Sequence, residues 1–245
     1  MMKLHTIGYW GAYPNVNEAT SCYLVEDNQT KILLDCGSGA LSKLQNVIKL
    51  EELDAVFISH THTDHMADIY SLEYAMLILH QLGKRKEPLD VYVYTDNISD
   101  LSFEFPHVMQ VHPIHLAESV NIGSLSVTFA ETIHEIPCCA MKISDPHGNV
   151  LVYSADTGYS KRLIDFADKA DTLLIECSFY AEQQGLTKGH LASYEVADIA
   201  SKAAVKNIIL THFPHYGNIN QLKEEVKSKT DQSVYLAKEG LTITI

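Results

Sequence analysis

The chain of 245 residues is 46% hydrophobic and 20% charged, as expected of a globular protein with a substantial core. This composition excludes a disordered chain, a collagen and a disulfide-stapled miniprotein. Acidic residues outnumber basic ones by 31 to 18, and the resulting net charge of −13 argues against a long nucleic-acid footprint because it repels a polyanion.

The first part of the chain alternates between strand-like and helix-like patterns. Residues 27–29, Asp-Asn-Gln, favour a turn between two β-rich runs, which predicts an opening hairpin. The later run AVFIS is short and apolar, which is typical of a buried strand. In chain order we expect strands at 20–26 and 31–35, a helix at 41–50, a strand at 54–59 and a helix at 66–82.

The remainder changes from strands alone to strands that alternate with helices. We expect strands at 91–95, 109–114, 125–129, 139–143 and 150–153, then helix 161–169, strand 172–176, helix 193–204, strand 207–211, helix 221–229 and strands 233–237 and 241–245. A β-rich half followed by an αβαβ half predicts an α+β fold in which helices cover sheets. Because no linker or internal repeat divides the chain, one domain is expected over residues 1–245.

The cysteines indicate the cellular compartment. They form an odd set without a C-x-x-C pair, which suits neither a disulfide framework nor a thiolate zinc site. The first residues lack a basic segment followed by an apolar run, and no stretch is long enough to span a membrane. We therefore expect a cytoplasmic protein with no membrane partner. The five cysteines are Cys22, Cys36, Cys138, Cys139 and Cys177.

Three histidines and an aspartate stand within six residues in HTHTDH, directly after the AVFIS strand. In an extended segment His60 and His62 project to the same side and can hold one ion, whereas Asp64 and His65 turn toward a neighbouring position once a helix begins. A polar surface loop is the alternative, but it does not account for this density of ligands. The segment predicts two adjacent divalent ions, with zinc as the first choice and manganese or iron open.

Further ligands are expected at the ends of other strands, where loops carry the functional residues of α/β proteins. His134, Asp156 and His212 each follow a predicted strand and are the candidates. Seven other histidines lack this setting and are interpreted as structural or surface residues. They are His5, His80, His107, His112, His115, His147 and His215.

Together, HTHTDH and the three later residues resemble the metal-binding pattern of the metallo-β-lactamase superfamily, and the resemblance covers nearly the whole chain. It implies an αββα sandwich, in which two packed sheets are flanked by helices and the active site lies at one edge of the sheets. It also implies a set of ligands for each ion. These are His60, His62 and His134 for one metal, Asp64, His65 and His212 for the other, and Asp156 between them.

Within the superfamily the chain is most similar to the ribonuclease Z-like phosphodiesterases, through TSCYLVE, LLDCG, LIECSF, GHLAS and NIILTHF. The resemblance implies that His190 of GHLAS lies near the scissile phosphate, and that a homodimer forms. Members that mature tRNA carry a long arm between the residues matching His134 and Asp156. Only 21 residues separate these two positions here, so the tRNA-binding arm is missing.

Three more acidic residues near these motifs have open interpretations. Asp35 could simply form a turn, but the resemblance favours a role in fixing the tautomer of a metal ligand. Asp68 could orient His65, although a favourable position at the start of a helix is the preferred interpretation. Glu176 ends a predicted strand and receives no assigned role.

The predicted reaction is hydrolysis of a small or short nucleotide phosphodiester. A hydroxide bridging the two metals would attack phosphorus, with Asp64 among the catalytic residues and His190 donating a proton to the leaving oxygen. A lactone or thioester hydrolase with the same metals is the alternative, because fold and ligands do not decide the substrate. A poised histidine is needed for a poor alkoxide leaving group and is dispensable for a thiolate. A binding module without turnover is disfavoured because all seven ligands are present.

Overall fold

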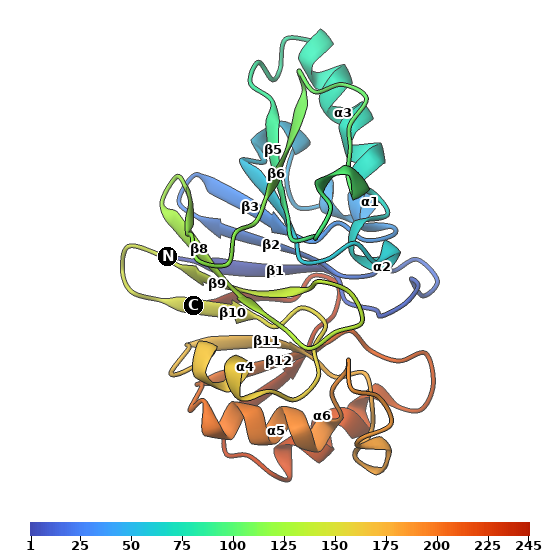
Figure 1. Ribbon diagram of the computed structural model, residues 1–245, viewed down its shortest axis with the longest axis vertical. Coiled ribbons are helices and arrows are strands. Elements are labelled where there is room, and N and C mark those ends of the chain that lie inside the picture. The colour runs from blue at the N-terminus through green and yellow to red at the C-terminus, as the bar shows by residue number, and fades with distance from the viewer.

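The computed structural model describes residues 1–245, and its centre is a pair of seven-stranded sheets (Figure 1). The first sheet has the order β14-β1-β2-β3-β4-β5-β6. Its strands from β3 to β6 are parallel, whereas β14, β1, β2 and β3 pair antiparallel. The strands are β1 (Lys3–Gly8), β2 (Cys22–Asp27), β3 (Thr30–Leu34), β4 (Ala55–Ile58), β5 (Leu89–Val93), β6 (Met109–Pro113) and β14 (Thr242–Thr244).

The second sheet has the order β13-β12-β11-β10-β9-β8-β7. Its strands from β10 to β13 are parallel, whereas β7 to β10 form an antiparallel meander. The strands are β7 (Val120–Ile122), β8 (Leu125–Glu131), β9 (Cys139–Ser144), β10 (Val150–Tyr153), β11 (Thr172–Glu176), β12 (Asn207–Thr211) and β13 (Ser233–Leu236).

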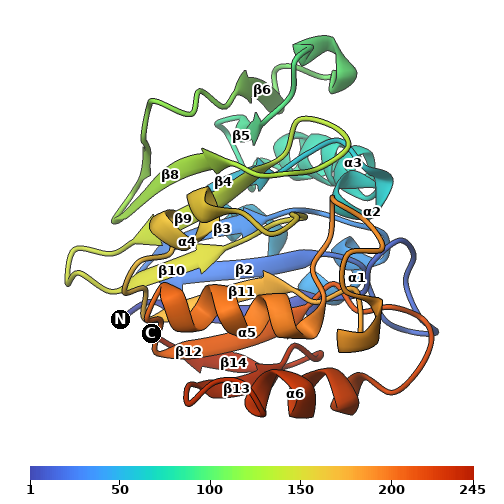
Figure 2. The same ribbon diagram turned by 60° about the horizontal axis from the view of Figure 1, so that its bottom comes forward.

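Helices cover the outer face of each sheet, which confirms the predicted αββα sandwich (Figures 1 and 2). The first sheet carries α1 (Ala40–Leu44) and α3 (Ile69–Gln81), with the short α2 (Thr63–Met66) at one end; the second carries α4 (Lys161–Phe166), α5 (Ser193–Lys202) and α6 (Ile219–Lys227). Short 3₁₀ turns lie at η1 (Leu50–Glu52), η2 (Ile98–Asp100) and η3 (Ala181–Gln183). None of the helices has the length and apolar character needed to cross a bilayer.

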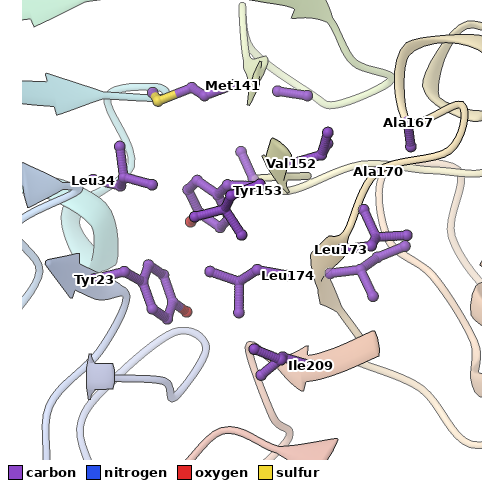
Figure 3. Close-up of a cluster of buried hydrophobic side chains, with 14 of the residues drawn as sticks. Tyr23, Leu34, Met141, Val152, Tyr153, Ala167, Ala170, Leu173, Leu174 and Ile209 are labelled. Atoms are coloured by element: carbon purple, nitrogen blue, oxygen red, sulfur yellow. The ribbon is translucent and has the colours of Figure 1, made fainter. Parts of the chain in front are cut away.

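The core between the sheets is built around two buried tyrosines (Figure 3). The rings of Tyr23 and Tyr153 lie 5.1 Å apart, between the two sheets. Each hydroxyl has a hydrogen-bond partner, as a buried tyrosine requires: the oxygen of Tyr23 lies 2.5 Å from the Thr211 hydroxyl, and Tyr153 donates to the Asp35 carboxylate at 2.7 Å. The core thus connects directly to polar residues at the ends of the strands.

The structure differs from the predicted elements at four places. β1 and β7 were not predicted: β1 pairs with β14 at one edge of the first sheet, and the three-residue β7 is the edge strand of the second, so tertiary pairing stabilises both. The predicted helix 66–82 begins only at Ile69, as α3, and Met66 instead ends the separate α2, because the carbonyl of His65 accepts from the Cys36 backbone N–H and the N–H of Asp68 donates to the Cys36 carbonyl. The predicted helix 41–50 ends early, since Lys49 has extended dihedral angles.

Six strands end at the same edge of the sandwich, namely β3, β4, β8, β10, β11 and β12. β8 runs parallel to β10, since both are antiparallel to β9, and therefore has the same direction as β11 and β12. In the first sheet β3 and β4 also run side by side in parallel. Loops that follow these strands consequently converge, and the predicted site residues lie on those loops.

Candidate metal centre

A first group of ligand atoms converges from two sheets. The Nε2 atoms of His60 and His134 lie 3.1 and 3.0 Å from Nδ1 of His62. Together with Asp156, these residues place their potential ligand atoms within 4.8 Å of one another. Three ring nitrogens facing one another, with a carboxylate beside them, form an arrangement that a divalent cation satisfies.

A second group lies next to the first. Nε2 of His212 is 3.2 Å from Oδ2 of Asp64, and Nε2 of His65 is 3.7 Å from the same oxygen. The Asp156 carboxylate lies between the groups. Its Oδ1 is 3.2 and 3.3 Å from Nε2 of His65 and His212, whereas its Oδ2 is 3.7 and 3.8 Å from Nε2 of His60 and His134. Each group therefore faces one oxygen of the shared aspartate.

Two of these atoms are buried without a hydrogen-bond partner. They are Nε2 of His65 and Oδ1 of Asp156. Although 3.2 Å apart, the two atoms are not aligned for a hydrogen bond with each other. Leaving such groups unsatisfied costs about 1–3 kcal/mol each. The residues therefore fit a metal ion on the evidence of their own atoms, and the His/Asp cluster is compatible with divalent metal binding.

The backbone at this edge carries unusual strain. Asp35, Ala155 and His212 have φ angles of 58°, 51° and 54°, in the left-handed region that residues with a Cβ atom rarely adopt. Such conformations cost on the order of 1–3 kcal/mol each and persist where the surroundings impose them. Here they turn the chain immediately after β3, β10 and β12, so the side chains of these loops are directed into the site.

Asp35 is buried and holds two of the histidines in place. Its Oδ2 lies 2.7 Å from Nδ1 of His65 and accepts hydrogen bonds from Tyr153 and from the hydroxyl of Ser59. The Ser59 hydroxyl also lies 3.0 Å from Nδ1 of His60. These contacts occupy the far nitrogen of both rings and leave Nε2 directed at the metal groups.

Nδ1 of His212 and Nδ1 of His134 are held in the same way. The Ser178 hydroxyl lies 2.9 Å from Nδ1 of His212 and donates to Glu176 at 2.7 Å. Nδ1 of His134 is 3.2 Å from the carbonyl oxygen of Gly189. Ser178 and Gly189 thus hold the rings of His212 and His134 from other loops.

Glu176 is the residue that sequence reasoning left without a role. It is buried at the end of β11, and its carboxylate lies 2.9 Å from Nδ1 of His190. It also accepts hydrogen bonds from the backbone N–H groups of Thr157 and Leu191. Burial opposes protonation of His190, but the Glu176 carboxylate outweighs it and raises the pKa of His190 to about 9. Its place at a strand end on the site edge is the signal that could have revealed it.

His190 lies beside both metal groups. Its ring is 5.1 Å from that of His134 and 5.5 Å from that of His212, measured between centroids. The structure thus brings all eight predicted site residues to one edge of the sandwich. His190 is held at Nδ1 by the Glu176 carboxylate, as His65 is held by that of Asp35, but it belongs to neither of the two groups.

The charge states of His60, His62 and Asp156 suit a metal, whereas Asp156 raises the pKa of His65 and of His212 against the effect of burial. Burial, and then the neighbouring His65, lower the pKa of His60, and burial and His134 lower that of His62, so both rings are neutral near pH 7. Burial opposes ionisation of Asp156, but His212 and His65 keep its pKa well below the usual range. Neutral imidazole and ionised carboxylate are the forms that bind metal.

Asp68 does not contact His65. Its carboxylate accepts a hydrogen bond from the backbone N–H of Leu41, in the first turn of α1, at 2.9 Å. The residue occupies the position before α3, as the preferred interpretation expected, but its side chain makes no cap bond to that helix. The partner of His65 is Asp35 instead, because Asp35 follows β3, next to β4 in the sheet.

The chain is similar to known proteins over most of its length. A family model described as a beta-lactamase superfamily domain matches residues 30–213. The probable metallo-hydrolase YhfI of Bacillus subtilis is 38% identical over 243 residues, which cover 98% of both chains. Ribonuclease Z of Methanopyrus kandleri is 25% identical over 282 positions, covering 100% of this chain and 98% of that protein.

Solved structures show the same likeness. The crystal structure of Bacillus subtilis YhfI matches with a TM-score of 0.94 at 37% identity, and the match covers 99% of this chain and 98% of that one. The short form of human tRNase Z matches with a TM-score of 0.77 at 20% identity, covering 99% of both chains. At this low identity the second match bears on the fold alone. The relatives agree with the likeness to ribonuclease Z that the sequence motifs indicate.

Proposed function

The chain belongs to the beta-lactamase superfamily and is a metallo-hydrolase, and from this premise we propose that it hydrolyses small or short nucleotide phosphodiesters with two bound divalent ions. Zinc is our first choice of metal, since it is bound in proteins by imidazole and carboxylate ligands. The same ligands also suit manganese and iron.

We assign one ion to His60, His62 and His134, the other to Asp64, His65 and His212, and a bridging position to Asp156. The opposed distances of the two Asp156 oxygens support this division. Bound ions of this kind supply Lewis acidity and an activated water.

The position of the His190 ring is the observation that favours a phosphodiester. The ring is held at Nδ1 by Glu176, which leaves Nε2 free beside both metal groups. A protonated imidazole held in this way can donate to an alkoxide leaving oxygen, which is a poor leaving group without a proton. Glu176 acts as a positioning residue, since it fixes the ring and favours its protonated form.

A hydrolysis screen of the metal-loaded protein tests the proposal. The substrates are bis-p-nitrophenyl phosphate, 2′,3′-cyclic nucleotides, lactones and thioesters. Selective hydrolysis of the phosphodiesters is expected. Preferential turnover of a lactone or thioester would instead support the alternative, in which the same residues serve attack at a carbonyl. Asp156→Ala, prepared in parallel, controls for contaminating phosphodiesterases.

The proposal also covers partners and location. A short substrate suits the net charge of −13, which disfavours a long nucleic-acid footprint. We propose a cytoplasmic location because the five cysteines are all buried and free, a state that a reducing compartment maintains. A homodimer is proposed on the likeness to ribonuclease Z alone.

A further inference from the structure

A cavity of about 400 Å³ opens beside the candidate metal centre. His190 and His212 form the side nearest the metal groups, so a substrate held by those residues would extend into it. The volume lies within the range of small-molecule sites. Its lining residues are Gly11, Ala12, Tyr13, Ser178, Phe179, His190, His212, Phe213, Pro214, His215 and Tyr216.

One wall of the cavity is an aromatic stack. The ring of Tyr13 lies 3.6 Å from that of His215 with an interplanar angle of 9°, and Trp10 stacks on the same imidazole at 4.9 Å. Nε2 of His215 lies 2.7 Å from the carbonyl oxygen of Tyr13 and 3.1 Å from that of Gly11. The N–H at this position can donate to these carbonyls, which holds the imidazole against the loop that carries Tyr13. Tyr13 is 57% exposed. It therefore ends the stack with room for another flat ring.

The lining carries no lysine, arginine, aspartate or glutamate. Beyond His190 and His212 on the metal side, the lining offers a second phosphate no cation, and an ammonium group would find no carboxylate. Phe179 and Tyr216 add further aromatic surface. The complementary ligand is consequently a neutral planar ring rather than a charged group.

The backbone of the loop that lines the cavity contacts two candidate metal ligands. The N–H of Ala12 donates to Oδ2 of Asp64 at 2.7 Å, which fixes the loop that carries Tyr13. Gly11 approaches the other side of the site so closely that a Cβ atom there would lie 2.7 Å from the His212 ring. The aromatic wall thus keeps a set position relative to two of the candidate metal ligands.

We propose that this cavity binds the base of the substrate by stacking it on Tyr13, so that the enzyme selects phosphodiesters that carry a nucleobase. The inference rests on the proposed phosphodiesterase function and names the part of the substrate that gives selectivity. A flat ring on an aromatic face gains stacking energy that does not depend on a hydrogen-bonding edge. Selection among the bases is therefore weak, and selection against an abasic phosphodiester is strong.

An acyl chain is the competing occupant, since it also suits an apolar wall. The two differ in what they require of position 13. A leucine there keeps apolar surface but removes the flat face, whereas a phenylalanine keeps the face and removes only the hydroxyl. Tyr13→Leu and Tyr13→Phe therefore separate stacking from general apolar contact.

The test compares adenosine 5′-(methyl phosphate) with its abasic counterpart, ribose 5-(methyl phosphate). The ratio of kcat/KM for the two should be large for the metal-loaded wild type and for Tyr13→Phe. It should fall about 5- to 150-fold in Tyr13→Ala and Tyr13→Leu, the range expected for one stacked base. Tyr74→Ala removes a tyrosine of similar exposure, 54%, from α3 and should keep the wild-type ratio.

Equal hydrolysis of both substrates by the wild type would overturn the base site while leaving the phosphodiesterase intact. Hydrolysis of neither would refute the proposed function, and the cavity is then judged by calorimetric titration with adenosine alone. Saturable binding that Tyr13→Ala loses and Tyr13→Phe keeps supports the site. No saturable binding, or binding unchanged in Tyr13→Ala, overturns it. Metal content is measured for each variant.

Discussion

Oδ2 of Asp35 and Nδ1 of His65 lie 2.7 Å apart in the interior, with neither side chain exposed to solvent. The same carboxylate accepts a hydrogen bond from Tyr153, which lies on the opposite sheet. One residue therefore joins the packing of the sandwich to the orientation of a candidate ligand. A change in how the sheets pack around Tyr153 should therefore alter the orientation of His65.

Asp35→Asn should weaken metal binding about 10- to 100-fold, the usual cost of losing the partner of a ligating histidine. The amide has one acceptor oxygen in place of two, so it can no longer accept from the Ser59 backbone N–H, which now bonds Oδ1, and also keep the contacts of His65 and Tyr153 on the other oxygen. Competition with a chelator measures the affinity. Asp54→Asn is the matched control, because Asp54 accepts a backbone N–H on the surface away from the site. Unchanged affinity in Asp35→Asn would contradict the assigned role.

The sequence predicts that the candidate ligands lie together, and the structure brings them together, because they share one physical rule. Each follows a β-run, and the carboxyl ends of parallel strands meet at one edge. The αββα architecture is confirmed, although part of that prediction came from likeness to a family rather than from periodicity. One domain over residues 1–245 stays a prediction.

Asp156 should control both metal groups, since each faces one of its oxygens. The wild type is expected to bind two ions per chain. Asp156→Ala should lose occupancy at both positions and lose activity, whereas His62→Ala should retain the ion of the other group. Elemental analysis after metal loading measures the stoichiometry. One ion in the metal-replete wild type, or two ions and full turnover in Asp156→Ala, would refute the dinuclear assignment.

Precursor tRNA should be a poor substrate. Residues 135–155 form the β9–β10 hairpin within the second sheet, where an arm that grips tRNA would need a long insertion. We expect affinity no better than the 10⁻⁴ to about 10⁻⁶ M of non-specific binding. Hydrolysis of precursor tRNA and of a small phosphodiester, compared at one salt concentration, measures the preference. Efficient tRNA-selective cleavage would show that binding energy arises elsewhere on the protein.

The hydrogen-bond partners of the candidate ligands were harder to predict than the place where the candidates meet. Asp68 is closer in sequence to His65, yet Asp35 makes the contact because β3 and β4 are neighbours in the sheet. Glu176 reaches His190 across 14 residues. These pairs depend on sheet order, and a residue pattern along one strand carries no information about the order of strands.

His190→Ala should retain both metals and lose about 10²–10⁴-fold in turnover of esters with poor leaving groups. An activated p-nitrophenyl ester needs less protonation of its leaving oxygen, so its loss should be smaller. Glu176→Gln removes the carboxylate that raises the pKa of His190, and should therefore move the alkaline limb of the rate profile to lower pH. His147→Ala, in the turn between β9 and β10 at the other edge of the sheet, is the control. Equal and slight losses on both ester types would return His190 to a structural role, because a proton donor must matter most where the leaving group is poorest.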